Sequence, residues 1–283
     1  MFRFSKIRET PLAVVDVGAA SMGEGTDSYA ALAADPAVRV VGFEPNAEAC
    51  AARNAAAPAH HKFLPYFIGD GTRRTFHLCA NPLTSSLYRP NERLLSLFHN
   101  LPLPVVGTSE VETRRLDDLD MIEACDFLKI DVQGAELDVL RGARKRLESC
   151  LVVHTEVEFV EMYEGQALFG DIDVFLRGEG MMFHRLVAPF SRQLKPLVFG
   201  SGPFGPGSQL LFAEAAVYVR AIDRLDRLSD AQILAYARIM HDIYASHDLV
   251  ALLLQEFDRR TDGGLLSRYA AALLADSATP GVS

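Results

Sequence analysis

The sequence contains no tryptophan, and only four of its 283 residues are cysteine. Cys50, Cys79, Cys125 and Cys150 are widely spaced and form no C-x-x-C pair, which argues against a zinc ribbon or a thioredoxin-type site. We interpret them as small apolar side chains of a protein kept in a reducing compartment.

Long hydrophobic runs are also missing. No stretch reaches the roughly 18 apolar residues of a membrane span, and the N-terminal residues MFRFSKIRETP lack the apolar segment of a secretory signal. We therefore expect a cytoplasmic protein with no membrane span. Basic residues number 28 against 37 acidic ones, and the net charge of −9 argues against broad binding to nucleic acid, although it is compatible with a local basic pocket.

The residues that are present fit a globular chain. Apolar residues make up 49% and charged residues 23%, which excludes a wholly disordered or collagen-like protein. The expected strands are residues 12–17, 38–43, 63–68, 127–130, 151–159, 183–187 and 209–219, and residues 75–78 are either an edge strand or a hairpin arm. The expected helices are 29–34, 47–57, 135–147 and 172–177, and a long loop at 81–110 carries one short helix at 92–99. This alternation predicts an α/β fold with a mostly parallel sheet covered by helices.

The last third of the chain has a different pattern. A Pro/Gly-rich loop at 195–208 joins the last two expected strands and predicts an antiparallel hairpin at one edge of the sheet. Three segments with helical spacing follow, at 229–246, 249–260 and 265–275. We therefore expect a Rossmann-like domain over residues 1–220 and a helical C-terminal extension over 221–283. The extension either packs on the sheet or supplies the surface of a homo-oligomer.

Acidic residues stand where the first two expected strands end. Asp16 comes just before Gly18 in VVDVGAA, where glycine allows a tight turn close to a ligand. Glu44 closes the second strand in GFEPN and is able to accept hydrogen bonds from both hydroxyls of a ribose. The carboxyl ends of parallel strands are where such sheets bind ligands. The dinucleotide fingerprint G-x-G-x-x-G is absent, but the acidic residues alone do not choose between an adenosyl and a nicotinamide cofactor.

Two later segments add candidates. Asp70 in IGDGT either hydrogen-bonds an adenine amino group or belongs to an ordinary Gly/Asp turn. Lys129 and Asp131 in DFLKIDVQGAE lie on the same side of their short strand. Charged side chains in an apolar strand are costly unless they are paired or lie at the strand end, so we interpret these two as part of a site.

The run DFLKIDVQGAELDVLRGA resembles the signature of FkbM-type S-adenosylmethionine-dependent methyltransferases. The segments VVDVGAA, GFEPN, IGDGT, SSLY, TRRLDDL and VVHTEVEF also follow the order of that family, and the resemblance covers roughly residues 12–190. It implies the class I methyltransferase fold, a seven-stranded sheet with an antiparallel last strand, and O-methylation of a hydroxyl on a small molecule or a sugar. It also assigns Asp16, Gly18, Glu44 and Asp70 to the S-adenosylmethionine site and Asp131 to the methyl-transfer pocket.

Methyl transfer to a hydroxyl needs a group that removes its proton. Alternation along 151–159 places His154, Glu156 and Glu158 on one face of the strand. Asp131 and Glu156 are the first candidates for the base, and His154 is the next. Gln133 stands where the family commonly has glutamate, which removes a charge beside Asp131. Nothing in the pattern demands a metal, and we expect none.

Two other functions stay open at this point. One is a nicotinamide-dependent oxidoreductase, against which the missing fingerprint argues. The other is a non-catalytic cofactor-binding or scaffold protein, because Gly23 of the first turn comes one position later than the family pattern has it. The acceptor would be recognised by the variable loops at 81–110 and 195–208.

Overall fold

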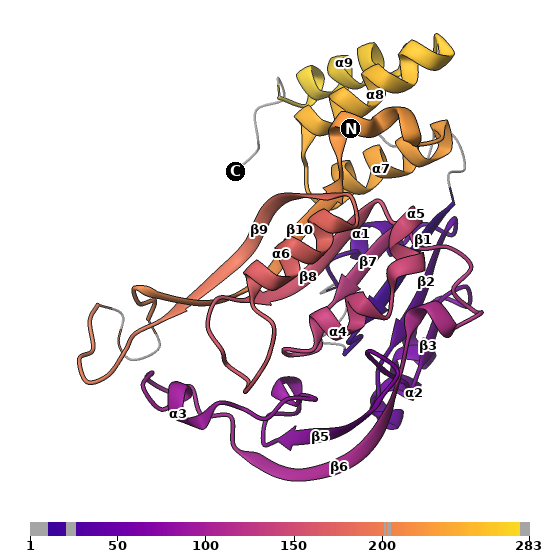
Figure 1. Ribbon diagram of the computed structural model, residues 1–283. Coiled ribbons are helices and arrows are strands. Elements are labelled where there is room, and N and C mark those ends of the chain that lie inside the picture. Colours follow the sequence, from indigo (N-terminus) through magenta and orange to yellow (C-terminus); the bar gives the residue numbers. More distant parts are fainter. Residues whose placement is uncertain (1–10, 21–26, 201, 203–204, 278–283) are drawn as a thin grey trace.

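The computed structural model describes residues 11–20, 27–200, 202 and 205–277. Its centre is a seven-stranded sheet in the order β3-β2-β1-β7-β8-β10-β9 (Figure 1). Its strands are β1 (Leu12–Val17), β2 (Val38–Phe43), β3 (Lys62–Leu64), β7 (Phe127–Ile130), β8 (Val152–Glu158), β9 (Met181–Arg192) and β10 (Gln209–Arg220). The predicted α/β class with a mostly parallel seven-stranded sheet is confirmed.

The antiparallel hairpin at the end of the sheet is formed by β9 and β10. The last strand along the chain, β10, is antiparallel as the family resemblance implies, but it is not the edge strand that we expected. Instead β10 inserts between β8 and β9 and is antiparallel to both, so the edge strand β9 has the same direction as the rest of the sheet. The order of strands cannot be deduced from their order along the chain, because an inserted hairpin arm and an outer one have the same sequence pattern.

A smaller sheet lies beside the first, in the order β4-β6-β5. Its strands are β4 (Phe67–Ile68), β5 (Arg73–Cys79) and β6 (Val105–Arg114). The strand expected at 63–68 is therefore wrong: Pro65, which has no backbone N–H to donate, lies between β3 and β4, and the two halves join different sheets. The expected loop at 81–110 ends in β6. This strand was not predicted, because most of its residues are polar or exposed and it lacks the apolar run of a buried strand.

Helices cover both faces of the large sheet. The bounds are α1 (Ala30–Ala33), α2 (Ala47–Ala56), α3 (Glu92–Leu95), α4 (Glu136–Arg141), α5 (Arg144–Ser149), α6 (Phe169–Gly178), α7 (Asp230–Asp242), α8 (His247–Thr261) and α9 (Leu265–Ser277). The helix expected at 135–147 is two helices, because the chain turns at Gly142, where a Cβ would lie 2.3 Å from the backbone oxygen of Gly69.

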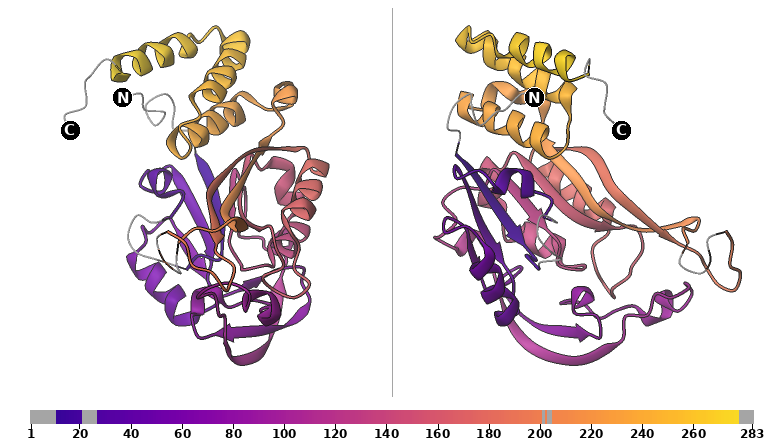
Figure 2. Two further views of the ribbon diagram at one scale, coloured as in Figure 1. Left: turned by 90° about the vertical axis from the view of Figure 1, so that its left-hand side faces the viewer. Right: turned by 180° about the vertical axis from the view of Figure 1, so that it is seen from behind.

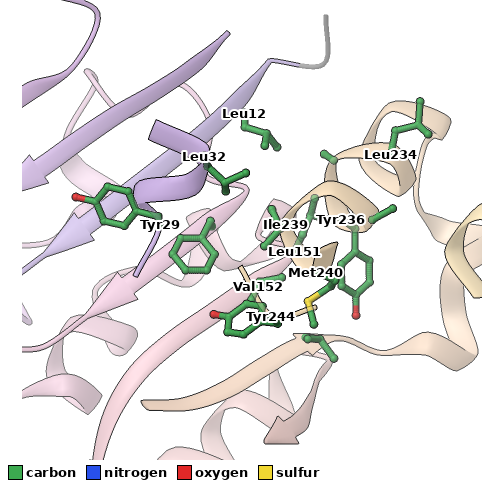
Figure 3. Close-up of a cluster of buried hydrophobic side chains, with 14 of the residues drawn as sticks. Leu12, Tyr29, Leu32, Leu151, Val152, Leu234, Tyr236, Ile239, Met240 and Tyr244 are labelled. Carbon is green, nitrogen blue, oxygen red and sulfur yellow. The ribbon is translucent and has the colours of Figure 1, made fainter. Parts of the chain in front are cut away.

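Alternate residues of the strands belong to two separate cores. Val15 of β1 and Val153 of β8 pack in the core that includes residues of α4, α5 and α6. Val14 and Val152, their neighbours on the other face, share a core with α7, α8 and α9. Figure 3 shows part of this second core, where strand side chains meet those of α7.

The three C-terminal helices predicted at 229–246, 249–260 and 265–275 are present as α7, α8 and α9. They gather at one end of the large sheet, and the small sheet lies toward the other end (Figures 1 and 2). They share a core with the sheet, and the division of the chain at residue 220 stays a prediction. Within the described ranges, none of the helices combines the length and the apolar composition of a transmembrane segment. All four cysteines are free and buried, as their interpretation as apolar side chains requires.

Candidate active site

Polar side chains form a row across the central strands of the sheet. The register pairs Asp16 of β1 with Lys129 of β7, and Lys129 with His154 of β8. Paired residues of parallel strands point to the same face, so these three side chains are neighbours. Asp131, just after β7, lies two positions after Lys129, and Glu156 lies two positions after His154 in β8. The sheet thus brings together five residues that the sequence predicts as parts of a site.

The carboxylate of Asp16 is buried, and both of its oxygens have partners within the protein. The hydroxyl of Tyr29 donates to its Oδ2 at 2.6 Å, and the ammonium of Lys129 lies 3.1 Å from its Oδ1. The same ammonium donates to the backbone oxygen of Gly18 at 2.7 Å. Burial opposes the charge on Lys129, but the carboxylates of Asp16 and Asp131 outweigh it and raise the pKa of Lys129. Asp16 therefore positions the turn at Gly18 through Lys129.

The turn after β1 requires glycine at position 18. Gly18 has a φ of +78°, and a Cβ there would lie 1.8 Å from the backbone oxygen of Asp131. The backbone N–H groups of Gly18 and Ala19 both donate to the oxygen of Phe43 at the end of β2. The turn is thereby held between β2 and β7. Gly23 and Gly25 lie outside the described residues.

Glu44 follows β2 and lies beside this turn. Its Oε1 accepts a hydrogen bond from the backbone N–H of Asn46 at 2.8 Å, and its Oε2 has no hydrogen bond to the residues that the structure describes. The side chain is largely buried, which raises the pKa of Glu44. A desolvated carboxylate with one unused oxygen fits a ligand that supplies hydroxyl donors, as a ribose does.

Gln133 joins the two leading candidates for the base. Its Nε2 donates to Oδ1 of Asp131 at 2.9 Å and to Oε2 of Glu156 at 2.6 Å. Its Oε1 accepts from the hydroxyl of Tyr163, and its backbone oxygen accepts from the hydroxyl of Ser86. Gln133 also has a φ of +57°, which is uncommon for a residue other than glycine. A neutral amide here allows both carboxylates to keep a donor between them.

Three glutamates form a buried cluster beyond Gln133. Carboxylate oxygens of Glu136, Glu156 and Glu158 lie within 4.8 Å of one another, a spacing that would also allow a cation to bind. Oε1 of Glu136 accepts from the backbone N–H groups of Val132 and Gly134, whereas Oε2 of Glu136 and Oε2 of Glu158 have no hydrogen-bond partner among the described residues. Burial raises the pKa of all three carboxyl groups, that of Glu136 to about 7.

His154 lies one row behind Glu156 and is almost fully buried. Its Nδ1 is 2.9 Å from the hydroxyl of Tyr244, which follows α7. Burial, with a further contribution from the nearby charge of Lys129, lowers the pKa of His154 to about 4. The ring is therefore neutral at physiological pH.

Asp70 lies away from this group. Its Oδ1 accepts from the backbone N–H and the hydroxyl of Thr72, and its Oδ2 is 3.7 Å from Arg74. Among the described residues it has no hydrogen bond or ion pair to Asp16, Glu44 or Asp131. The structure thus places Asp70 in a local turn, and its assignment to the adenine side stays a prediction.

The two loops expected to recognise the acceptor meet in space. Phe98 forms an isolated β-bridge with Leu194, and the backbone N–H of Lys195 donates to the oxygen of Leu97. The two segments are therefore joined where residues 97–98 meet residues 194–195.

A comparison with known families identifies the chain. Residues 16–183 match the family described as the methyltransferase FkbM domain, which is more than half of the sequence. The chain belongs to the FkbM methyltransferase family. The resemblance in VVDVGAA, GFEPN and DFLKIDVQGAE is thereby confirmed, and neither alternative function is favoured.

Three individual proteins that resemble this chain are at most 31% identical to it over the aligned residues. The 2-O-methyltransferase NoeI of Sinorhizobium fredii (strain NBRC 101917 / NGR234) is 31% identical over 166 residues, which cover 54% of this chain and 66%, just under two thirds, of NoeI. A crystal structure of methyltransferase FkbM from Methylobacillus flagellatus KT is 13% identical, with a TM-score of 0.39 over 74% of this chain and 44% of that one. A structure of LepI in complex with SAM is 11% identical, with a TM-score of 0.34 over 77% and 47%. These structural similarities are too weak to carry an argument.

Three contributors to this candidate site were not predicted. Tyr29, Tyr163 and Tyr244 bond Asp16, Gln133 and His154 through their hydroxyls. Tyr29 and Tyr244 stand in segments of helical spacing, where a tyrosine is an ordinary core residue. Only the packing of those helices on the sheet reveals their partners.

Proposed function

We propose that this FkbM-family protein is an S-adenosylmethionine-dependent O-methyltransferase. The observation that carries the proposal is a set of three carboxylates. Glu44 and Asp131 follow β2 and β7 beside the turn at Gly18, and Glu156 of β8 is joined to Asp131 through Gln133. S-adenosylmethionine, when bound, supplies a methyl group on a positively charged sulfur. An acidic rim favours such a cation.

Each residue has a distinct role in this proposal. Glu44 accepts hydrogen bonds from the ribose hydroxyls through its unused oxygen. Gly18 lets the backbone approach the cofactor closely, and Asp16 holds that turn in place through Lys129. Asp70 is the candidate for the adenine side.

The acceptor hydroxyl must lose its proton as the methyl group is transferred. Asp131, Glu156 and His154 are the three candidates for the base. Burial and the neighbouring Asp131 raise the pKa of Glu156 well above its usual range, so its ionised form is a stronger base than an exposed carboxylate. The amide of Gln133 holds Asp131 and Glu156 together through one hydrogen bond to each carboxylate.

The acceptor class follows from the relative. NoeI is a 2-O-methyltransferase, and a small molecule or sugar with a free hydroxyl is the acceptor that we propose for this chain. The joined loops at 81–110 and 195–208 would recognise it. A cytoplasmic location and a homo-oligomer formed through α7, α8 and α9 also belong to this proposal.

A transfer assay tests the function. The purified full chain is incubated with S-adenosylmethionine that carries a labelled methyl group and with a panel of hydroxylated sugars and small molecules, with NADH in a parallel reaction. We expect label in at least one acceptor and no oxidation of NADH. Cofactor binding without transfer to any acceptor would instead support a non-catalytic binding protein.

A further inference from the structure

The histidine of the proposed site is held by a residue that lies outside the family domain. The match to the FkbM family ends at residue 183, whereas Tyr244 follows α7. Its hydroxyl lies 2.9 Å from Nδ1 of His154, and both side chains are at least nine-tenths buried. The ring centroids are 6.2 Å apart and the ring planes are tilted by 30°.

The segment around Tyr244 is fixed from several sides. Arg185 of β9 donates to the backbone oxygen of Tyr244 and to the hydroxyl of Ser246. Ala245 has a φ of +48°, and the backbone N–H of Ser246 donates to the oxygen of Met240. The turn after α7 is thus an ordered element that holds the phenol against the sheet.

The hydrogen bond has one consistent direction. The phenol is buried, so it keeps its proton. His154 Nδ1 is the one hydrogen-bond partner of that hydroxyl among the described residues. A buried hydroxyl needs an acceptor for its proton, and a neutral imidazole offers one nitrogen as acceptor while the other carries hydrogen.

We propose that Tyr244 is a positioning residue of the active site, which donates to Nδ1 of His154 and thereby fixes the neutral ring with its hydrogen on Nε2. This inference rests on the proposed function only in treating the residues around His154 as an active site. Its consequence is that His154 has no free nitrogen to act as the base. Its Nε2–H is a hydrogen-bond donor one row behind Glu156, and the proton of the acceptor goes to a carboxylate, Glu156 or Asp131.

Histidine-selective nitrogen NMR tests the tautomer directly. The full chain is labelled with ¹⁵N-histidine, His154 is assigned by the signal that His154→Gln removes, and two-bond proton–nitrogen correlations distinguish hydrogen on Nε2 from hydrogen on Nδ1. Tyr244→Phe removes the donor. Tyr236→Phe is the matched control, because Tyr236 is a buried tyrosine of α7 whose hydroxyl donates to the backbone oxygen of Arg220. Figure 3 shows the two hydroxyls pointing in different directions.

We expect the Nε2–H pattern in the wild type and in Tyr236→Phe, and a shifted Nδ1 signal with both tautomers populated in Tyr244→Phe. Where transfer is measurable, Tyr244→Phe should lower kcat by about fivefold, the equivalent of one neutral hydrogen bond, with KM for the cofactor unchanged. Hydrogen on Nδ1 in the wild type, or an unchanged His154 signal in Tyr244→Phe, would overturn the inference. If the wild type transfers no methyl group, the proposed function fails, while the NMR result still decides the tautomer.

Discussion

At the scale of single residues, the sequence predicted the members of the site better than their partners. Lys129 and Asp131 stand two positions apart in DFLKIDVQGAE, on the same side of the strand, and this spacing predicts that both belong to a site. The structure places the ammonium of Lys129 3.1 Å from Asp16 and 4.0 Å from Asp131. The partner of Lys129 depends on which strand lies beside β7, and the residues of the motif alone do not determine that.

Glu156 is the residue on which proton removal depends most directly. Glu156→Gln keeps the shape of the side chain and an oxygen that accepts from Gln133, but it cannot take up a proton. We expect kcat to fall by about 100-fold or more, as for the loss of a general base, with binding of S-adenosylhomocysteine within about twofold of wild type. Steady-state kinetics and calorimetry measure the two effects. An unchanged kcat would move the role of base to Asp131.

At the scale of elements, the buried strands were predictable and the polar ones were not. The bounds of β1, β2 and β7 match the expected segments because continuous apolar runs mark strands covered on both faces. β6 was hidden because most of its residues are exposed, and α4 and α5 were merged because Gly142 interrupts an otherwise continuous helical pattern. Close contacts between elements, such as that at Gly142, leave no periodic signal.

The turn between β1 and the following segment gives a test at this scale. Gly18→Ala would force a Cβ into the backbone of Asp131 and disfavour the positive φ. We expect a loss of about 2 kcal/mol or more in the free energy of unfolding. Gly107→Ala is the control, since Gly107 lies in β6 with no atom within 4 Å of the added Cβ. Urea denaturation of both variants measures the difference, and equal stabilities would contradict the proposed role of the turn.

At the scale of the whole molecule, the buried ionisable groups couple stability to pH in opposite directions. Burial raises the pKa of Glu136 to about 7, so the folded state binds more protons than the unfolded state and loses stability as pH rises through this value. Burial lowers the pKa of His154 to about 4, so the folded state binds fewer protons and loses stability as pH falls.

Two variants separate these effects. From about pH 4.5 to 7, Glu136→Gln should gain stability relative to wild type, on the order of 2 kcal/mol. His154→Gln should gain relative stability in the other direction, as pH falls from about 6.5 to 4. Denaturant unfolding at a series of pH values gives both slopes. Two slopes of the same sign would show that these groups do not titrate as their burial requires.

The central claim is that the cofactor binds where β1, β2 and β7 end, and that Glu44 accepts hydrogen bonds from its ribose hydroxyls. Calorimetric titration of S-adenosylhomocysteine into wild type, Glu44→Ala and Glu48→Ala tests it, because Glu48 is an exposed glutamate four residues away on α2. The account predicts binding to the wild type, a loss of more than about 1 kcal/mol, or about fivefold in affinity, in Glu44→Ala, and no change in Glu48→Ala. No binding to the wild type, or equal affinity in all three proteins, would contradict it.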